Sequence, residues 1–292
     1  MSIELAWARC RRRLLRWFRP GYVRRMADKR QGDCPGCPHD IIDARDLKYC
    51  RNVCGFWFHR QDSPFRTRGP FGLARYGLAE LLIFSLLLGV AAVCLAIAGA
   101  MLHWSAWLGL FPVVLAWLEI VYFFRDPQRS IPDDPHALVS PADGTVTNVE
   151  EVVQDDFPGG RALRISIFLS IFNVHVNRIP RSGRVVDVRY FPGAFLDARN
   201  PESAVRNEQL WIDMVEADTG RPMRVKQISG AIARRIVCWL KAGDEVARGE
   251  RLGMIKLGSR TDLLLPADAA MEVLVKPGDK VRGAATVLLR LP

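Results

Sequence analysis

Two apolar stretches lie next to each other in the 292-residue chain, and they limit what it can fold into. Residues 77–102 contain Glu80 as their only charged residue, and residues 104–124 contain only Glu119. Each stretch reaches the roughly 20 residues that an α-helix needs to cross a bilayer core. Neither stretch has the polar face that a helix on the surface of a soluble domain shows. We therefore predict a helical hairpin in a membrane over residues 77–124.

Basic residues at both outer ends of this hairpin predict its orientation. Three arginines precede it and two follow it, namely Arg66, Arg68, Arg75, Arg125 and Arg129. Because loops rich in Lys and Arg stay on the cytoplasmic side, we expect both outer ends to face the cytoplasm. The hairpin would then lie in the inner membrane of a bacterial cell. Pro112 interrupts the second stretch, so a re-entrant hairpin is the alternative to a spanning one.

The excess positive charge of the chain lies at its N-terminal end. The formal net charge is +10, and residues 1–75 hold 17 Lys and Arg against 7 Asp and Glu, so the rest of the chain has no excess. A neutral C-terminal part argues against a nucleic-acid-binding protein. Residues 1–31 interleave arginine with leucine, tryptophan and phenylalanine, which is typical of a basic amphipathic arm on an anionic membrane. A solvated arm and an RNA-binding arm are the alternatives.

Residues 32–62 hold four of the seven cysteines in two close pairs, Cys34 with Cys37 and Cys50 with Cys54. Pairs with this spacing can place four thiolates around a tetrahedral Zn²⁺, so we predict a zinc knuckle with a structural zinc. Two disulfides or four unconnected thiols are the alternatives, and a cytoplasmic location argues against disulfides. A zinc ribbon that binds nucleic acid is a further alternative, against which the two apolar stretches argue.

Residues 125–292 read as short runs of β-branched and apolar residues separated by Gly, Pro and Asp, which predicts strands and turns. Residues 241–256 and 276–291 both have a Gly-Asp turn, a valine and a glycine before an apolar strand. This repeat is similar to the hairpins of biotinyl and lipoyl carrier modules. We therefore predict a β-rich (α+β) domain with a barrel-sandwich, lipoyl-like pseudo-repeat.

Three short segments of this domain carry residues suited to catalysis. Asp143 stands in a turn at residues 140–144, His175 follows an apolar strand, and Ser259 stands in a Leu-Gly-Ser-Arg segment. Each signal alone is weak, because an Asp-Gly pair is usually only a turn and a single histidine is more often structural. Apart from His136, however, His175 is the only histidine of this domain, so proton transfer near pH 7 falls to it.

Together these segments resemble the phosphatidylserine decarboxylase family. The resemblance covers more than half of the chain and includes FFRDPQR (123–129), VSPADGTV (139–146), FNVHVNR (172–178), FPGAFLDAR (191–199) and the segment around the GSR motif (228–266). It implies a proenzyme that cuts itself between Gly258 and Ser259 into a β chain, residues 1–258, and an α chain, residues 259–292. Ser259 would become a pyruvoyl group at the start of the α chain.

The resemblance also implies a substrate and partners. The pyruvoyl group would form a Schiff base with phosphatidylserine of the anionic membrane and release phosphatidylethanolamine and CO₂. The α and β chains would stay associated, and the family suggests a homodimer.

The residue types fit the chemistry of self-cleavage. Ser259 Oγ would attack the carbonyl of Gly258, where glycine leaves room for the attack. His175 is the fitting base, and Asp143 would orient and charge its imidazole. The resemblance assigns these positions to the family's Asp-His-Ser triad. His175 is also the candidate acid for the decarboxylation step. Longer family members carry a second histidine three residues before this position, where Phe172 stands here; if that histidine donates the proton in them, this protein must use another group.

Three polar residues near these groups are candidates for holding the substrate's carboxylate or phosphate, namely Arg260, Asn177 and Arg178. A surface ion pair is the alternative for Arg260. The rival function is a membrane-tethered, lipoyl-like carrier or adaptor module without activity. Such a carrier would display a lysine at a hairpin tip, near Lys256, but this function leaves the other segments of the resemblance unexplained.

Overall fold

The structure is a computed structural model that describes residues 2–32, 57–63, 66–231, 235–256, 258–268 and 270–292. The predicted zinc ligands Cys34, Cys37, Cys50 and Cys54 lie outside these ranges. Within the ranges, no group of three or more His, Cys, Asp or Glu side chains is placed to hold a metal ion. The zinc knuckle therefore stays a prediction.

The N-terminal arm is helical. It consists of α1 (Ser2–Phe18) and α2 (Pro20–Lys29) and ends in the strand β1 (Arg30–Gln31). Strand β1 pairs with β2 (Trp57–Phe58), which is followed by the 3₁₀-helix η1 (Arg60–Asp62). Pro20 occupies the first position of α2, where its missing N–H breaks no helical hydrogen bond, and it separates the two helices. Trp17 and Phe18 at the end of α1 are exposed.

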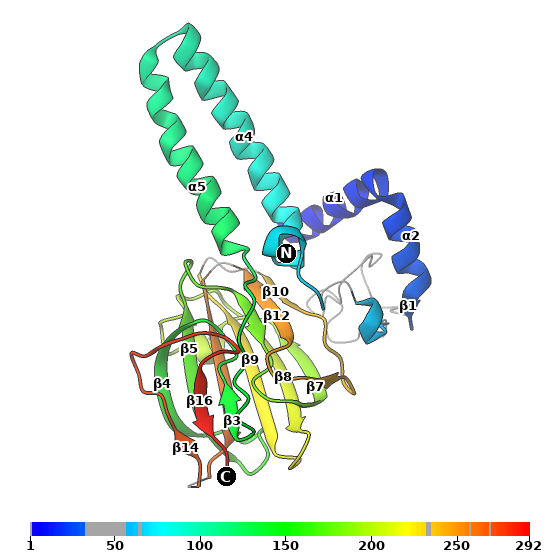
Figure 1. Cartoon of the computed structure of the whole chain (residues 1–292), viewed down its shortest axis with the longest axis vertical. Helices are drawn as coiled ribbons and strands as arrows, with labels where there is room; N and C mark the ends of the chain where they lie inside the picture. Colours follow the sequence, from blue (N-terminus) through cyan, green and yellow to red (C-terminus); the bar gives the residue numbers. More distant parts are fainter. Residues whose placement is uncertain (1, 33–56, 64–65, 232–234, 257, 269) are drawn as a thin grey trace.

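The predicted hairpin consists of α4 (Leu78–Met101) and α5 (Leu110–Phe123), which run side by side away from the rest of the chain (Figure 1). The 3₁₀-helices η2 (Pro70–Gly72) and η3 (Arg75–Gly77) precede α4, and η4 (Trp104–Gly109) leads into α5. Glu80–Met101 of α4 and Trp104–Phe123, which comprises η4 and α5, are each long and apolar enough to cross a membrane. Pro112 is the third residue of α5, where a proline is tolerated, so it does not break the helix.

The C-terminal domain is β-rich, as predicted, and its described residues contain one short helix, α6 (Ser203–Arg206). An eight-stranded antiparallel sheet with the order β11-β7-β8-β9-β13-β5-β4-β15 curls into a half-barrel (Figure 1). Its strands are β4 (Gly144–Val153), β5 (Arg161–Leu169), β7 (Gly183–Phe191), β8 (Gln209–Glu216), β9 (Pro222–Ser229), β11 (Glu245–Val246), β13 (Ser259–Pro266) and β15 (Lys280–Val281). Strand β13 is therefore an interior strand, with β9 on one side and β5 on the other.

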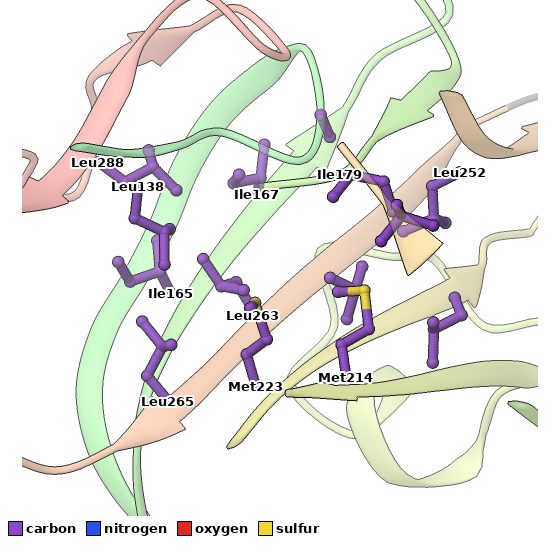
Figure 2. Close-up of a cluster of buried hydrophobic side chains, with 14 of the residues drawn as sticks. Leu138, Ile165, Ile167, Ile179, Met214, Met223, Leu252, Leu263, Leu265 and Leu288 are labelled. Carbon is purple, nitrogen blue, oxygen red and sulfur yellow. The ribbon is translucent and has the colours of Figure 1, made fainter. Parts of the chain in front are cut away.

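Two three-stranded sheets complete the domain, in the orders β10-β12-β6 and β14-β16-β3. Their strands are β3 (Ala137–Val139), β6 (Val176–Arg178), β10 (Arg235–Cys238), β12 (Arg251–Lys256), β14 (Glu272–Val273) and β16 (Val287–Arg290). Leu252 of β12 and Leu288 of β16 pack in the same core as Leu263 of β13 (Figure 2). The small sheets therefore help to close the core of the half-barrel.

The alternation of side chains along β13 gives its two faces different roles. Leu263 and Leu265 point into the apolar core, where they meet Ile165 and Ile167 of β5 (Figure 2). Asp262, the residue before Leu263, points to the opposite face because successive residues of a strand alternate.

The two repeat segments have matching elements. In residues 241–256, β11 pairs at one edge of the large sheet and β12 lies in a small sheet. In residues 276–291, β15 pairs at the other edge and β16 lies in the second small sheet. The likeness of this arrangement to a lipoyl module stays a prediction.

Candidate active site

Ser259 is the first residue of β13, in the interior of the large sheet. It pairs with Ser229 of β9 and Leu169 of β5, and its side chain is fully buried. Its Oγ makes no hydrogen bond with any described residue. A buried hydroxyl without a partner is uncommon, and such exceptions are found at catalytic groups.

Two glycines shape the backbone before Ser259. Gly258 has a φ of 64°, in the left-handed region that favours glycine. Its carbonyl oxygen lies against Gly230, where an added Cβ would come within 2.5 Å of that oxygen and 3.3 Å of the Cβ of Ala198. The carbonyl that Ser259 is predicted to attack therefore approaches the backbone of residue 230 so closely that only glycine fits there.

His175 is fully buried in the loop between β5 and β6 and contacts Gly258, the residue before Ser259. The N–H of Gly258 donates to Nε2 at 3.2 Å, and Nδ1 lies 2.9 Å from the carbonyl oxygen of Asn173. A carbonyl oxygen can only accept, so Nδ1 carries the hydrogen and Nε2 presents its lone pair. Phe123, at the end of α5, packs on the imidazole with the ring centroids 4.3 Å apart.

The surroundings of His175 keep it neutral. Burial lowers the pKa of His175 to about 4, because the charged imidazolium would lose its water. The Asn173 carbonyl opposes this lowering, and the nearby charge of Arg125 adds to it. The imidazole is therefore uncharged at pH 7 and can accept a proton on Nε2.

Asp143 has different partners from those that the sequence predicts. Arg129 Nη2 donates to both of its carboxylate oxygens, at 2.8 and 2.7 Å. The N–H of Gly283 donates to its Oδ1 at 2.8 Å. Neither of the hydrogen bonds described for the His175 ring involves Asp143, and the group that holds the imidazole is the carbonyl of Asn173. A backbone carbonyl leaves no signature in a sequence, so the sequence analysis could not find this contact.

Arg260 points away from the core and is held by neighbours on its own face of the sheet. Its Nε donates to Asp262 Oδ1 at 2.6 Å, and its Nη2 donates to Ser166 Oγ at 2.8 Å. Both members of the ion pair are buried, so the surface ion pair considered for Arg260 is in fact an interior one. The i, i+2 spacing of the two residues on a strand was the signal for this contact.

Asn177 and Arg178 are buried in β6 and also bonded internally. Asn177 Nδ2 donates to Thr261 Oγ1 at 3.2 Å, and Gln227 donates to Asn177 Oδ1 at 2.7 Å. Arg178 forms an ion pair with Asp126, which lies in the segment between the hairpin and β3. These contacts tie β6 to β9, to β13 and to the base of the hairpin.

Two further contacts, which the sequence analysis missed, bring the hairpin to the site. Arg125 Nη2, just after α5, donates to the carbonyl of Phe172 at 2.8 Å. Glu80, in the first turn of α4, forms an ion pair with Lys256 of β12. A lone carboxylate in an apolar stretch needs a partner, and this was the signal in the sequence.

Comparison with known proteins gives consistent results. Residues 118–289 match the family model described as phosphatidylserine decarboxylase. A phosphatidylserine decarboxylase proenzyme of Rhodopirellula baltica is 46% identical over 245 residues, which is 84% of this chain and 98% of the relative. Proenzymes of the same name from Desulfotalea psychrophila and Symbiobacterium thermophilum are 48% and 47% identical, over 61% and 69% of this chain and 82% and 91% of their own.

Proposed function

This chain belongs to the phosphatidylserine decarboxylase family, and from that premise we propose the residues by which it matures and acts. Its reaction is the decarboxylation of phosphatidylserine to phosphatidylethanolamine and CO₂, by a pyruvoyl group that the proenzyme makes from its own chain. The pyruvoyl carbonyl condenses with the substrate amine and accepts the electrons that the departing CO₂ leaves behind. The residue that becomes the pyruvoyl group is Ser259, and the cut lies between Gly258 and Ser259.

One observation carries this assignment. Ser259 Oγ is buried and has no described partner, and the adjoining Gly258 N–H is bonded to Nε2 of a neutral histidine. In the first step Ser259 Oγ attacks the carbonyl carbon of Gly258, and His175 Nε2 takes the hydroxyl proton. The C–N bond then breaks, the proton passes to the nitrogen of Ser259, and an ester replaces the amide.

The second step releases the β chain. A base removes the α-proton of residue 259, and the ester C–O bond breaks on the Ser259 side. The carboxylate of Gly258 leaves as the new C-terminus of the β chain. The dehydroalanine that remains takes up water and loses ammonia, which leaves the pyruvoyl group. His175 is the candidate base here and the candidate acid in the decarboxylation, because Phe172 provides no second titratable group.

We propose that Asp143 connects the two chains of the matured enzyme, since its described partners are Arg129 and Gly283. It belongs to the proposed β chain, and it accepts a hydrogen bond from Gly283 of the proposed α chain. Its ion pair with Arg129 fixes the carboxylate in that position. The association of the two chains after the cut is supported further by β13, which pairs with β5 over residues 259–266 and with β9 over residues 259–264.

The alternative of a lipoyl-like carrier fits the structure less well. A carrier lysine must be displayed to the enzymes that modify it, whereas Lys256 is 8% exposed and ion-paired with Glu80. Strands β11 and β15 of the two repeat segments lie at opposite edges of the large sheet, and β12 and β16 lie in the two small sheets. This correspondence supports a pseudo-twofold, lipoyl-like arrangement of the strands without the carrier function.

We also propose that α4 and α5 span the inner membrane with both outer ends in the cytoplasm. The arm 1–31 would lie on the anionic lipid that contains the substrate, with Trp17 and Phe18 in the headgroup region. Protease added outside inside-out vesicles should remove the arm and reach the decarboxylase domain at 125–292. A homodimer is part of the same proposal, and the mass of the detergent-purified enzyme tests it.

The cysteine segment is proposed to hold a structural zinc. Metal analysis of the purified full chain should find about one zinc per chain. A Cys34→Ser/Cys50→Ser variant should lose it, and a chain without stoichiometric zinc would rule the site out.

Intact mass spectrometry tests the proposed cut most directly. The purified protein should contain chains 1–258 and 259–292, with the second one starting in a ketone and blocked to N-terminal sequencing. Ser259→Ala and His175→Ala should stay uncut, whereas the matched control His136→Ala should be cut like the wild type. A folded, active preparation with a single uncut chain would rule out the pyruvoyl at residue 259.

A further inference from the structure

The segment that leads to the cut is held from several directions. The N–H of Ile255 donates to the backbone carbonyl of His175 at 3.4 Å, and the N–H of Gly258 donates to the ring of the same residue. Between these two contacts, Lys256 turns its side chain toward the hairpin and pairs with Glu80. Backbone N–H groups of this segment therefore contact His175, and the side chain of Lys256 ties the segment to the first turn of α4.

The ion pair is shielded from water. The side chains of Lys256 and Glu80 are 10% and 17% exposed. Charges in such surroundings attract each other more strongly than on an open surface. The Lys256–Glu80 ion pair is therefore stronger than a pair of the same charges exposed to water would be.

The Lys256–Glu80 pair lies close in sequence to the bond between Gly258 and Ser259. Lys256 is the last residue of β12, three positions before Ser259. Strand β12 lies between β10 and β6 in its small sheet, whereas Ser259 begins β13 in the large sheet. The chain therefore passes from one sheet to the other between Lys256 and Ser259, and Lys256 is a side chain anchored shortly before the scissile peptide.

We propose that Glu80 is a positioning residue for self-cleavage, which acts through Lys256 to hold the Gly258 carbonyl where Ser259 Oγ can attack it. This inference rests on the proposed cut and adds to it a role for a residue of the apolar hairpin. It also gives a reason for the single carboxylate of residues 77–102: the charge serves the cleavage segment of the catalytic domain. The α4 helix is thus part of the processing machinery.

The test measures the rate of self-cleavage in the full chain. Precursor is labelled in a short cell-free pulse with lipid vesicles, and the α chain is followed with time. Glu80→Gln and Lys256→Met should be cut roughly 10- to 100-fold more slowly, the range that a misplacement of about 1 Å causes. The charge-reversed double variant Glu80→Lys/Lys256→Glu should recover most of the wild-type rate, because it restores the pair.

A matched control removes the same chemical group elsewhere. Glu151 pairs with Arg161 on exposed side chains at the far end of β5 from the site. Glu151→Gln should therefore be cut at the wild-type rate. Hydroxylamine, which cleaves esters and leaves amides intact, gives a second readout: it should release no α chain from Glu80→Gln, because the acyl shift itself is slowed.

Each outcome decides the matter. Cutting of Glu80→Gln at the wild-type rate overturns the inference, as does a folded double variant that stays as slow as the single ones. Release of the α chain from Glu80→Gln by hydroxylamine also overturns it. If Glu80→Gln did not fold, the double variant alone would decide. A wild-type precursor that is never cut before Ser259 would refute the proposed function instead, which keeps the two failures distinct.

Discussion

Replacement of Phe123 by alanine should change the pH range over which the precursor cuts itself. Phe123 is buried and lies against the imidazole of His175, with ring centroids 4.3 Å apart. Its removal lets water reach the imidazole, and a hydrated imidazolium is no longer disfavoured. The pKa of His175 should therefore rise from about 4 toward the ordinary value of 6.5.

The size of the effect follows from the two pKa values. At about pH 5.5, an imidazole with a pKa of 4 is about 97% neutral, whereas one with a pKa of 6.5 is only about 9% neutral. Only the neutral form can take the proton of Ser259 Oγ. From about pH 8 to about pH 5.5, the wild-type rate should change little, and the rate of Phe123→Ala should fall by up to roughly tenfold.

The assay compares each variant with itself. Precursor labelled in a short pulse is moved into buffers of different pH, and the α chain is quantified with time. The ratio of the two rates cancels any general loss of stability that the cavity left by Phe123 causes. Phe71→Ala is the matched control, because Phe71 is 99% exposed and its loss should leave the ratio unchanged.

Two results would refute this reasoning. The wild-type rate could itself fall with a midpoint near 6.5, which would mean that His175 is not shielded or is not the base. Alternatively, Phe123→Ala could keep the wild-type ratio, which would mean that the ring does not keep water away from the imidazole.

Substitutions at Gly230, Asp143 and His175 test other contacts of the site. Gly230→Ala places a Cβ 2.5 Å from the Gly258 carbonyl oxygen and should slow self-cleavage roughly 100-fold. Uncut precursor should then be visible in the intact mass spectrum. Cleavage at the wild-type rate would contradict the close approach of the Gly258 oxygen to residue 230. Asp143→Asn breaks a largely buried ion pair with Arg129 and should lower the free energy of unfolding by about 3 kcal/mol in a denaturant titration. The dependence of the self-cleavage rate on pH should stay unchanged. A shifted pH dependence would instead indicate that Asp143 contacts the imidazole of His175. Because the pKa of His175 is lowered, its contribution to the free energy of unfolding is fully present above pH 6.5 and is lost as the pH falls toward about 4. The wild type should therefore lose more stability than His175→Gln over that interval in denaturant titrations. Equal losses would speak against a buried neutral imidazole.

Much of the fold was predictable because it depends on patterns of hydrophobicity. The two apolar stretches have no polar face, and they form α4 and α5. The short apolar runs of residues 125–292 form strands, and among the described residues of this domain the structure adds the short helix α6 to them. Pro112 suggested an interruption of the second stretch, but it lies in the first turn of α5; its effect depends on where the helix begins, and helix ends are poorly marked in a sequence.

The site was predictable in its residue types and less so in its contacts. His175 Nε2 accepts a hydrogen bond from the N–H of Gly258, the residue next to Ser259, whereas Ser259 Oγ has no hydrogen-bond partner among the described residues. The partner of Asp143 was missed, because Arg129 was considered only for its charge at the end of the hairpin. Such a pairing depends on which segments of the folded chain meet, and the types of the two residues do not encode this.

The interior place of β13 has a consequence for the life of the enzyme. Before the cut, the strand belongs to one chain, and an unfolded precursor can recover its native state by itself. After the proposed cut, the same strand belongs to a separate peptide of 34 residues that must be recaptured between β9 and β5. Renaturation of the mature enzyme then becomes a bimolecular process that depends on concentration and competes with aggregation. The protein would thus give up reversible folding in exchange for its pyruvoyl group, and the mature enzyme would rely on slow unfolding to persist.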